Sequence, residues 1–577
     1  MSSPGLVIRN GTIVDGLGGD PYEADLAVAD GKVAAIGGSI PKGAEEINAR
    51  GKLVTPGFVD VHTHYDAQVT WSERLSPSSW NGATTVLLGN CGVGFAPCHD
   101  DQHDMLINLM EGVEDIPEVV MTAGLPWNWH SFPDYLDAIA RRRFDVDVAT
   151  QVPHAALRVY VMGERGANRE PATEADRRRM AELTREGLRA GALGFSTSRT
   201  LNHRAADGRS IPTLRAEEAE LTAIAHAMRE TGAGWLQIVS DFEDQMGEIG
   251  LFRRLAKESG RPITISMLQS HVRPDGWRTL LAEIDEANRE GFRITAQVRS
   301  RPTSVLLGFE LSQNPFMGRP SYKAIAHLPF AGRLAELRKP EFRARIMKEA
   351  FEGGGRERRV DRWDRMFPFG DPPDYEPNYE PGPESSIAAR AKREGRTPEE
   401  VAYDLLLQRD GREMLYLPVT NFAAGNLDVV REMIAAPNTL IGLGDGGAHV
   451  GIMCDATATS YTLTHWTRDR GGSLFPVAWA IKRLAADNAA AIGLNDRGVL
   501  KVGMKADINI LDYDNMRLRA PEVVYDLPAG GKRLVQRTDG FDATIVSGAV
   551  VYRDGEPTAA LPGRLVRGAR EASARAT

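Results

Sequence analysis

The residues best suited to chemistry begin with two histidines, His62 and His64, which are separated by a single residue. They follow the segment Pro-Gly-Phe-Val-Asp at residues 56–60, where a turn pair leads into an apolar, strand-like run. Because side chains alternate between the two faces of a strand, both imidazoles are expected to point the same way. Two imidazoles on one side of a strand end form half of a metal site, so we predict that both are metal ligands.

A cysteine follows the next apolar run. Cys91 lies in the segment Gly-Asn-Cys-Gly at residues 89–92, where a metal could hold its thiolate deprotonated. The His-x-His segment resembles the opening of the amidohydrolase superfamily. The Asn-Cys-Gly segment and residues 110–117 are similar to the D-aminoacylase branch of that superfamily. In that branch this cysteine is a zinc ligand in place of the carboxylated lysine of many relatives, which implies the same role for Cys91.

The resemblance implies two further ligands, and the chain matches them unequally. Residues 270–273 read Ser-His-Val-Arg, similar to a family Ser-His-x-Lys in which the histidine binds metal and the cation meets the substrate carboxylate. His271 is therefore predicted to be a ligand, and Arg273 is either a bidentate substrate contact or a solvated charge. At residues 239–241 the chain has Val-Ser-Asp where the family has Val-Ser-His. Asp241 either replaces that histidine, since carboxylates also bind zinc, or leaves the site one ligand short.

The glycine-rich segment 442–449 contains the residue expected to move a proton. Asp445 stands where the superfamily has its general base, so the resemblance implies that it binds metal and serves as general acid and base. Glycines around it allow a metal and a substrate to approach closely. His449 is either substrate-facing or structural. After residues 293–298 the family often has an aspartate and paired tyrosines, whereas this chain has Arg299 and Arg301, either of which could bind an anionic part of a substrate.

A site of this kind combines nitrogen, sulfur and oxygen ligands. That combination suits zinc best, although other divalent metals also occupy such sites. The expected chemistry is hydrolysis, because a bound metal acidifies water and polarises a carbonyl. Asp445 would accept the proton of the water and deliver it to the leaving nitrogen. The number of metal ions, one or two, is left open.

Alternating strand-like and helical runs must position these residues. We identify eight candidate strands, at residues 58–63, 84–89, 146–153, 194–198, 235–239, 263–269, 293–298 and 440–444. Helical patterns such as 174–190 and 216–231 lie between them. The pattern predicts an α/β fold, a (β/α)8 barrel over residues 58–497, with its active site at the carboxyl ends of the strands.

Both ends of the chain are rich in short strands. Residues 1–57 contain two hairpin signals, Asn10-Gly11 and Asp30-Gly31, and residues 498–577 contain strand-like runs at 506–512 and 543–552. We expect the two ends to form one small sheet domain, and the resemblance implies a composite β-sandwich. One interval, about 301–408, is rich in Arg, Pro and Gly and shows no barrel strand. It is either a surface insertion or a lid, and we favour the lid because it follows a strand end on the catalytic face.

Composition narrows the functional classes. A net charge of -9 and a pI of about 5.8 argue against nucleic acid and anionic membranes as partners. No run of 18 apolar residues suggests a membrane span. With 3 cysteines and no signal-peptide pattern at the N-terminus, we expect a cytoplasmic protein, and a homo-oligomer is possible.

Three functions remain open from the sequence. The first is a zinc amidohydrolase that cleaves the C–N bond of an N-acyl amino acid, such as an N-acyl-D-amino acid, or of a similar linear amide. The second is a hydrolase of a lactam, urea, carbamate or ester, which the departures at Asp241 and Arg299 favour. The third is a non-catalytic oligomeric scaffold, against which His62, His64, His271 and Asp445 all argue.

Overall fold

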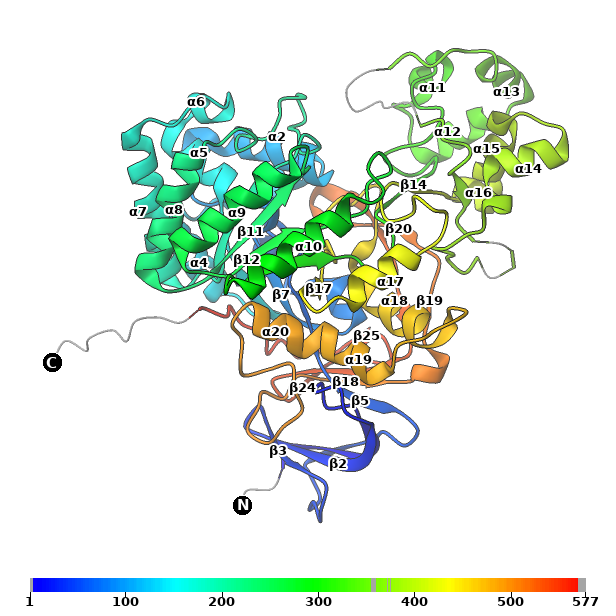
Figure 1. Cartoon of the computed structure of the whole chain (residues 1–577). Coiled ribbons are helices and arrows are strands. Elements are labelled where there is room, and N and C mark those ends of the chain that lie inside the picture. Colours follow the sequence, from blue (N-terminus) through cyan, green and yellow to red (C-terminus); the bar gives the residue numbers. More distant parts are fainter. Residues whose placement is uncertain (1–3, 354–359, 371, 374, 569–577) are drawn as a thin grey trace.

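Eight parallel strands form a barrel in the computed structural model, which describes residues 4–353, 360–370, 372–373 and 375–568 (Figure 1). The strands are β6 (Phe58–Asp60), β7 (Ala83–Leu88), β8 (Asp147–Thr150), β10 (Gly194–Arg199), β11 (Trp235–Ser240), β12 (Ile263–Ser266), β13 (Ile294–Val298) and β17 (Thr439–Ile441). A short strand, β9 (Val152–Pro153), directly follows β8 and pairs with β10. Each candidate barrel strand is present, and the predicted fold class is confirmed.

The barrel closes between its last and first strands. Thr63 and Gly446 form a parallel bridge, and the side-chain amide of Asn488 donates to the carbonyls of Val59 and Ile441, each at 2.9 Å. The loops after β6 and β17 therefore lie side by side. This closure brings the His-x-His segment against the glycine-rich segment that carries Asp445.

Helices α7 (Glu174–Ala190), α8 (Glu218–Thr231), α9 (Gln245–Ser259) and α10 (Gly276–Arg289) alternate with the strands. The bounds of α7 are those predicted from the sequence, because its ends carry strong signals. Thr173 and Asp176 form a reciprocal capping box at its start. Gly191, at φ 114°, adopts the left-handed conformation that ends it.

The two ends of the chain share one nine-stranded sheet. The amino-terminal part supplies β1 (Leu6–Ile13), β2 (Tyr22–Ala29), β3 (Lys32–Ile36), β4 (Glu45–Asn48) and β5 (Leu53–Pro56), and the carboxyl-terminal part supplies β18 (Ile508–Leu511), β23 (Phe541–Val546), β24 (Ala549–Arg553) and β25 (Glu556–Pro557). The halves join where β5 pairs antiparallel with β18, placing Val54 opposite Ile510. Both side chains are buried in the core of this sheet.

Part of the carboxyl-terminal region leaves that sheet. Strands β20 (Glu522–Leu527) and β21 (Gly531–Val535) form a hairpin. The amide of Leu534 donates to the carbonyl of Val450 at 2.7 Å, which places this hairpin beside the loop after β17. Residues predicted to belong to the sandwich therefore also contact the catalytic face of the barrel.

The Asn10-Gly11 hairpin prediction is wrong. Strand β1 continues through both residues, and its pairing with β2 shifts register between Ile8 and Gly11. Asn10 takes a positive φ of 57° inside this β-bulge, and a Cβ on Gly11 would lie 2.4 Å from the Val54 side chain. An Asx-Gly pair with a left-handed first residue thus produces a bulge at Asn10-Gly11. At Asp30-Gly31 it makes the predicted turn between β2 and β3.

The insertion forms a helical unit with its own hydrophobic core. It lies between two antiparallel strands, β14 (Ser304–Leu307) and β16 (Leu415–Pro418). Its helices are α11 (Pro320–Ile325), α12 (Phe330–Leu337), α13 (Pro340–Ile346), α14 (Ile387–Glu394), α15 (Pro398–Leu406) and α16 (Gln408–Gly411). They pack around a core that includes Phe309, Phe316 and Tyr403, and Figure 1 shows them grouped at one side of the barrel. The lid function stays a prediction.

In the described ranges, no helix combines the length and the apolar character needed to cross a bilayer.

Candidate metal centre

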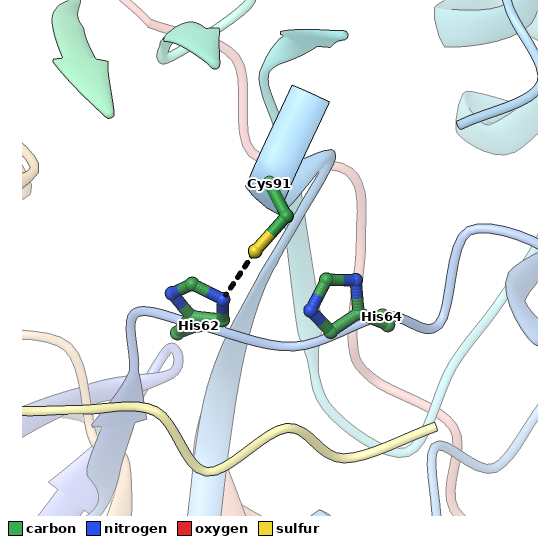
Figure 2. Close-up of side chains that lie close together, drawn as sticks. All are labelled: His62, His64 and Cys91. Atoms are coloured by element: carbon green, nitrogen blue, oxygen red, sulfur yellow. Dashed lines mark hydrogen bonds between the residues drawn. The ribbon is translucent and has the colours of Figure 1, made fainter. Parts of the chain in front are cut away.

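Three predicted ligands meet at the carboxyl ends of the first two barrel strands. His62 and His64 follow β6, and Cys91 belongs to a short 3-10 helix (Asn90–Gly92) after β7. Their ligand atoms all lie within 4.8 Å of one another, and all three side chains are buried. Figure 2 shows both imidazoles on the same side of their segment, facing the thiol. The Nε2 of His62 lies 3.3 Å from Cys91 Sγ. The predicted orientation of the two histidines is thus present.

The backbone of Cys91 is held in an unusual conformation. Its φ is +56°, in the left-handed region that non-glycine residues seldom occupy. Its amide donates to Gln237 Oε1 on β11 at 2.9 Å, and the amide of Gly92 donates to Ser196 Oγ on β10 at 2.9 Å. Side chains from two neighbouring barrel strands therefore hold the loop that aims the thiol at the histidines.

A second polar contact sets the orientation of the His62 ring. Its Nδ1 lies 2.6 Å from Gln297 Oε1 on β13. Because an amide oxygen only accepts hydrogen bonds, the Nδ1 of His62 carries the proton in this pair. The lone pair is then on Nε2, the nitrogen that faces Cys91. This is the arrangement in which metal-ligating histidines are usually held.

Asp445 lies next to the three residues. Its amide donates to the His62 carbonyl at 2.9 Å, and its backbone has a φ of 44°. Its Oδ1 is 3.6 Å from His62 Nε2, whereas its Oδ2 accepts a hydrogen bond from Arg299. Burial opposes ionisation of Asp445, but Arg299 and the surrounding histidines His62, His64 and His449 together outweigh it and lower the pKa of the carboxyl. Asp445 is therefore a carboxylate at neutral pH.

Glu114 is a site residue that the sequence did not single out. It ends helix α2 (His103–Glu114), is 1% exposed, and places Oε1 3.2 Å from His64 Nδ1. Its Oε2 lies 3.9 Å from His449 Nε2. The sequence did contain a signal for Glu114, because this carboxylate falls on the same helix face as the apolar residues Met110 and Val113. A charge on a buried helix face requires a partner.

The buried polar groups fit a bound divalent cation. Glu114 Oε2, Asp445 Oδ1 and His64 Nδ1 make no hydrogen bond within the described part of the chain. Burial, followed by the nearby carboxylates, raises the pKa of Cys91 and of Glu114 well above their usual values. Buried lone pairs and acids at such density are costly without a positive charge, which a metal would supply. His62, His64 and Cys91 would hold it, with Asp445 and Glu114 alongside.

Two predicted ligands are not brought into this cluster. The carboxylate of Asp241 accepts hydrogen bonds from Thr200 Oγ1 and from the amide of Leu201, the latter at 2.7 Å, so it holds the loop after β10. The half-buried His271 lies after β12, where Arg365 of the insertion is among the charges that act on it. Their role as ligands stays a prediction.

The predicted substrate contacts have separate environments. Arg273 is exposed and donates to the carbonyls of Glu243 and Asp241, at 3.1 and 3.2 Å. Arg299 is buried between Asp445 and Asp455. His449 is beside Glu114, and its side chain is 27% exposed. The substrate-binding roles of Arg273, Arg299 and His449 stay predictions.

His203, which the sequence placed only in a loop, is also close to this group. Its Nδ1 is 2.9 Å from Ser198 Oγ. Burial, then His449, lowers the pKa of His203 to about 3, so its ring is neutral.

Comparison with known proteins gives a consistent result. The sequence model of the amidohydrolase family matches residues 45–552. An uncharacterized protein of Mycobacterium tuberculosis (strain ATCC 25618 / H37Rv) is 27% identical, over 96% of this chain and 92% of its own. The D-aminoacylase of Alcaligenes xylosoxydans xylosoxydans is 25% identical, over 97% of each chain.

Solved structures with the same fold include a zinc-complexed deacylase. The N-acyl-D-glutamate deacylase of Bordetella bronchiseptica, complexed with zinc and a phosphonate inhibitor, superposes with a TM-score of 0.65. The match covers 98% of this chain and 100% of that one, at 23% identity. The resemblance inferred from the His-x-His and Asn-Cys-Gly segments is confirmed.

Proposed function

Because this chain belongs to the amidohydrolase family, we propose that it is a zinc-dependent hydrolase that cleaves the C–N bond of a linear N-acyl-D-amino acid. The observation that carries the proposal is the convergence of His62, His64 and Cys91 beside Oδ1 of Asp445, which makes no hydrogen bond in the described part of the chain. The similarity to D-aminoacylase over nearly the whole chain supports the substrate class.

The donor set agrees with zinc. Two imidazoles and a thiolate are common zinc ligands, and His62 is already oriented by Gln297. The chemistry supplied by a divalent ion at this position is polarisation of the scissile carbonyl and acidification of a water molecule. The chain itself contributes burial, which excludes bulk water from the reacting groups.

Asp445 carries the proton in this proposal. Its Oδ1 faces the metal centre and makes no hydrogen bond among the described residues, so it can accept the proton of the attacking water. It then donates that proton to the leaving nitrogen, which departs as a neutral amine. Arg299 binds Oδ2 and so fixes the position of the carboxylate, while Oδ1 carries out the proton transfers.

The position of the arginines after β13 favours a second candidate. Arg299 and Arg301 both bind Asp455, and Arg299 also binds Asp445. Both arginines are therefore already paired within the protein and are not placed to bind a substrate carboxylate. A substrate without a carboxylate, such as a lactam, urea, carbamate or ester, does not require an arginine to bind one.

The test is amine release from paired D- and L-N-acyl amino acids by the zinc-reconstituted protein. Release from the D-forms alone is expected. Asp445→Asn should lower turnover by about 10²- to 10⁴-fold, the usual contribution of a general acid or base, while zinc content stays nearly unchanged. An Asn variant that keeps most of its turnover would remove Asp445 from this role. Zinc-loaded protein that releases amine from neither form would move the search to the second candidate.

A further inference from the structure

Two arginines after β13 join Asp445 to a buried chain of alternating charges. Arg299 donates through Nη2 to Asp445 Oδ2 and through Nη1 to Asp455 Oδ2. Arg301 donates through Nη2 to Asp455 Oδ1 at 3.0 Å. Arg299, Arg301 and Asp455 are 2%, 0% and 4% exposed. The order of charges from the metal centre outward is therefore negative, positive, negative, positive.

The outer end of this chain is fixed by several segments. Arg301 also donates to Thr457 Oγ1 at 2.9 Å and to the carbonyl of Cys454 at 2.7 Å. Its guanidinium lies 4.1 Å from the centre of the Tyr379 ring, a favourable contact between a cation and an aromatic face. If Arg299 turned toward a substrate, the buried Asp455 would lose one of its two arginine partners. Removing a partner from a buried charge costs free energy.

The contact with Arg299 gives the two oxygens of Asp445 different environments. Oδ2 is bound to the guanidinium, whereas Oδ1 is 3.6 Å from His62 Nε2 and unpaired among the described residues. The terminal torsion of an aspartate has a broad, roughly two-fold preference. The carboxylate therefore needs an external contact to hold one oxygen toward the metal centre.

We propose that Arg299 is a positioning residue that directs Oδ1 of Asp445 at the metal centre, and that Asp455 is the counter-charge that holds Arg299 in place. This inference rests on the proposed function, because it takes Asp445 as the proton carrier. It differs from the prediction that Arg299 binds the substrate. If Arg299 positions Asp445, its substitution should lower kcat, whereas if Arg299 binds the substrate, its substitution should raise KM.

The test compares kcat and KM for Arg299→Met with those of the wild-type zinc enzyme on an N-acetyl-D-amino acid. A misdirected carboxylate should lower kcat by about 100-fold, as expected for a misplacement near 1 Å, and change KM by less than about 3-fold. Arg299→Lys, which keeps the charge but not the two-pronged guanidinium, should recover only part of the loss. A rise in KM with kcat unchanged would show a substrate clamp and overturn the proposal.

Asp455 supplies a second measurement. Asp455→Asn should also lower kcat at nearly constant KM. Added to Arg299→Met, it should cause less than about a 2-fold further loss, because residues that act through one another are not additive. Full additivity would overturn the link between them. Arg497→Met is the matched control, and its kcat should stay within about 2-fold of wild type. Arg497 is 5% exposed and forms an ion pair at 2.7 Å with Asp147, the first residue of β8, at the end of that strand opposite the metal centre.

A spectroscopic readout separates this inference from the proposed function. In cobalt-substituted protein, Arg299→Met should change the visible absorption in the same direction as Asp445→Asn, with equal cobalt content. If the wild-type protein hydrolyses no N-acyl amino acid, the proposed function fails, and this spectrum still tests the positioning. A spectrum of Arg299→Met identical to wild type would overturn it.

Discussion

At the residue scale, two groups of the metal centre, Cys91 and Glu114, favour the protonated state without a cation and the ionised state with one. Burial keeps Cys91 and Glu114 protonated, because it raises the pKa of both. A divalent cation reverses that preference, since metal binding displaces the thiol proton. Asp445 differs from them because Arg299 already supplies a positive charge. Asp445 is therefore ionised before a metal binds, whereas the Cys91 thiol and the Glu114 carboxyl would lose their protons when it binds.

Glu114 gives a prediction at this scale. Glu114→Gln removes a carboxyl group 3.2 Å from His64 Nδ1 that can ionise when a cation binds. Loss of such an outer contact typically weakens metal binding by about 10- to 100-fold. Chelator competition would measure the zinc affinity. Glu118→Gln, at an exposed position four residues later, should bind zinc like wild type. Equal affinities for both variants would show that Glu114 does not support the centre.

At the element scale, the return segment of the insertion is tied to the last helical region of the barrel. Glu380 accepts hydrogen bonds from His465 Nε2 and Arg470 Nε, both at 3.0 Å. The amide of Leu427, which precedes α17 (Asp428–Ala435), donates to the same carboxylate at 2.8 Å. Burial opposes the charge, but the hydrogen bonds from His465, Arg470 and Leu427, with the charge of Arg470, together lower the pKa of Glu380 to about 2.

This contact predicts a pH dependence of stability. Because the pKa of Glu380 is lower in the folded state, its contribution is fully present above the unfolded pKa of about 4.3 and is lost as pH falls toward about 2. Glu380→Gln should lower the free energy of unfolding by about 2–3 kcal/mol at pH 7. Urea unfolding at pH 7 and pH 3 would show this difference narrowing in acid. A gap independent of pH, or an equal effect of the exposed control Glu384→Gln, would contradict the assignment.

At the scale of the whole molecule, the chain has separate hydrophobic cores. Ile510 is buried in the core of the composite sheet, and Phe316 is buried in the core of the insertion. The composite sheet depends on strands from both ends of the chain, so unfolding of this sheet removes the pairing of β5 with β18. The insertion enters and leaves through the adjacent strands β14 and β16, and its helices pack mainly on one another.

The two cores should therefore respond differently to a cavity. Ile510→Ala and Phe316→Ala should each cost about 2–5 kcal/mol locally. Hydrogen exchange should rise in β1, β5 and β18 for Ile510→Ala, and only within the insertion for Phe316→Ala. Zinc binding by Phe316→Ala should match wild type. Faster exchange throughout the barrel in Phe316→Ala would show that the insertion and barrel unfold together.

The sequence by itself determined the local features. Strand and helix periodicity gave all eight barrel strands and the bounds of α7, since these depend on residues close together in the chain. The His-x-His spacing determined that His62 and His64 share a face, and the Asn-Cys-Gly segment identified Cys91. Asn10-Gly11 was misread because a left-handed residue serves both a turn and a bulge, and the choice depends on the strand alongside.

Tertiary structure alone decided which distant groups meet. Glu114 reaches His64 across 50 residues of chain, and Arg299 meets Asp455 across 156. These pairings depend on how loops from separate strand ends pack at the mouth of the barrel. Residue type does not encode that packing, because a buried arginine and a substrate-binding arginine look alike in sequence. Burial decides between them: a charge withdrawn from water must be paired within the protein, and the closure of the barrel at Thr63 and Gly446 sets which partners lie within reach.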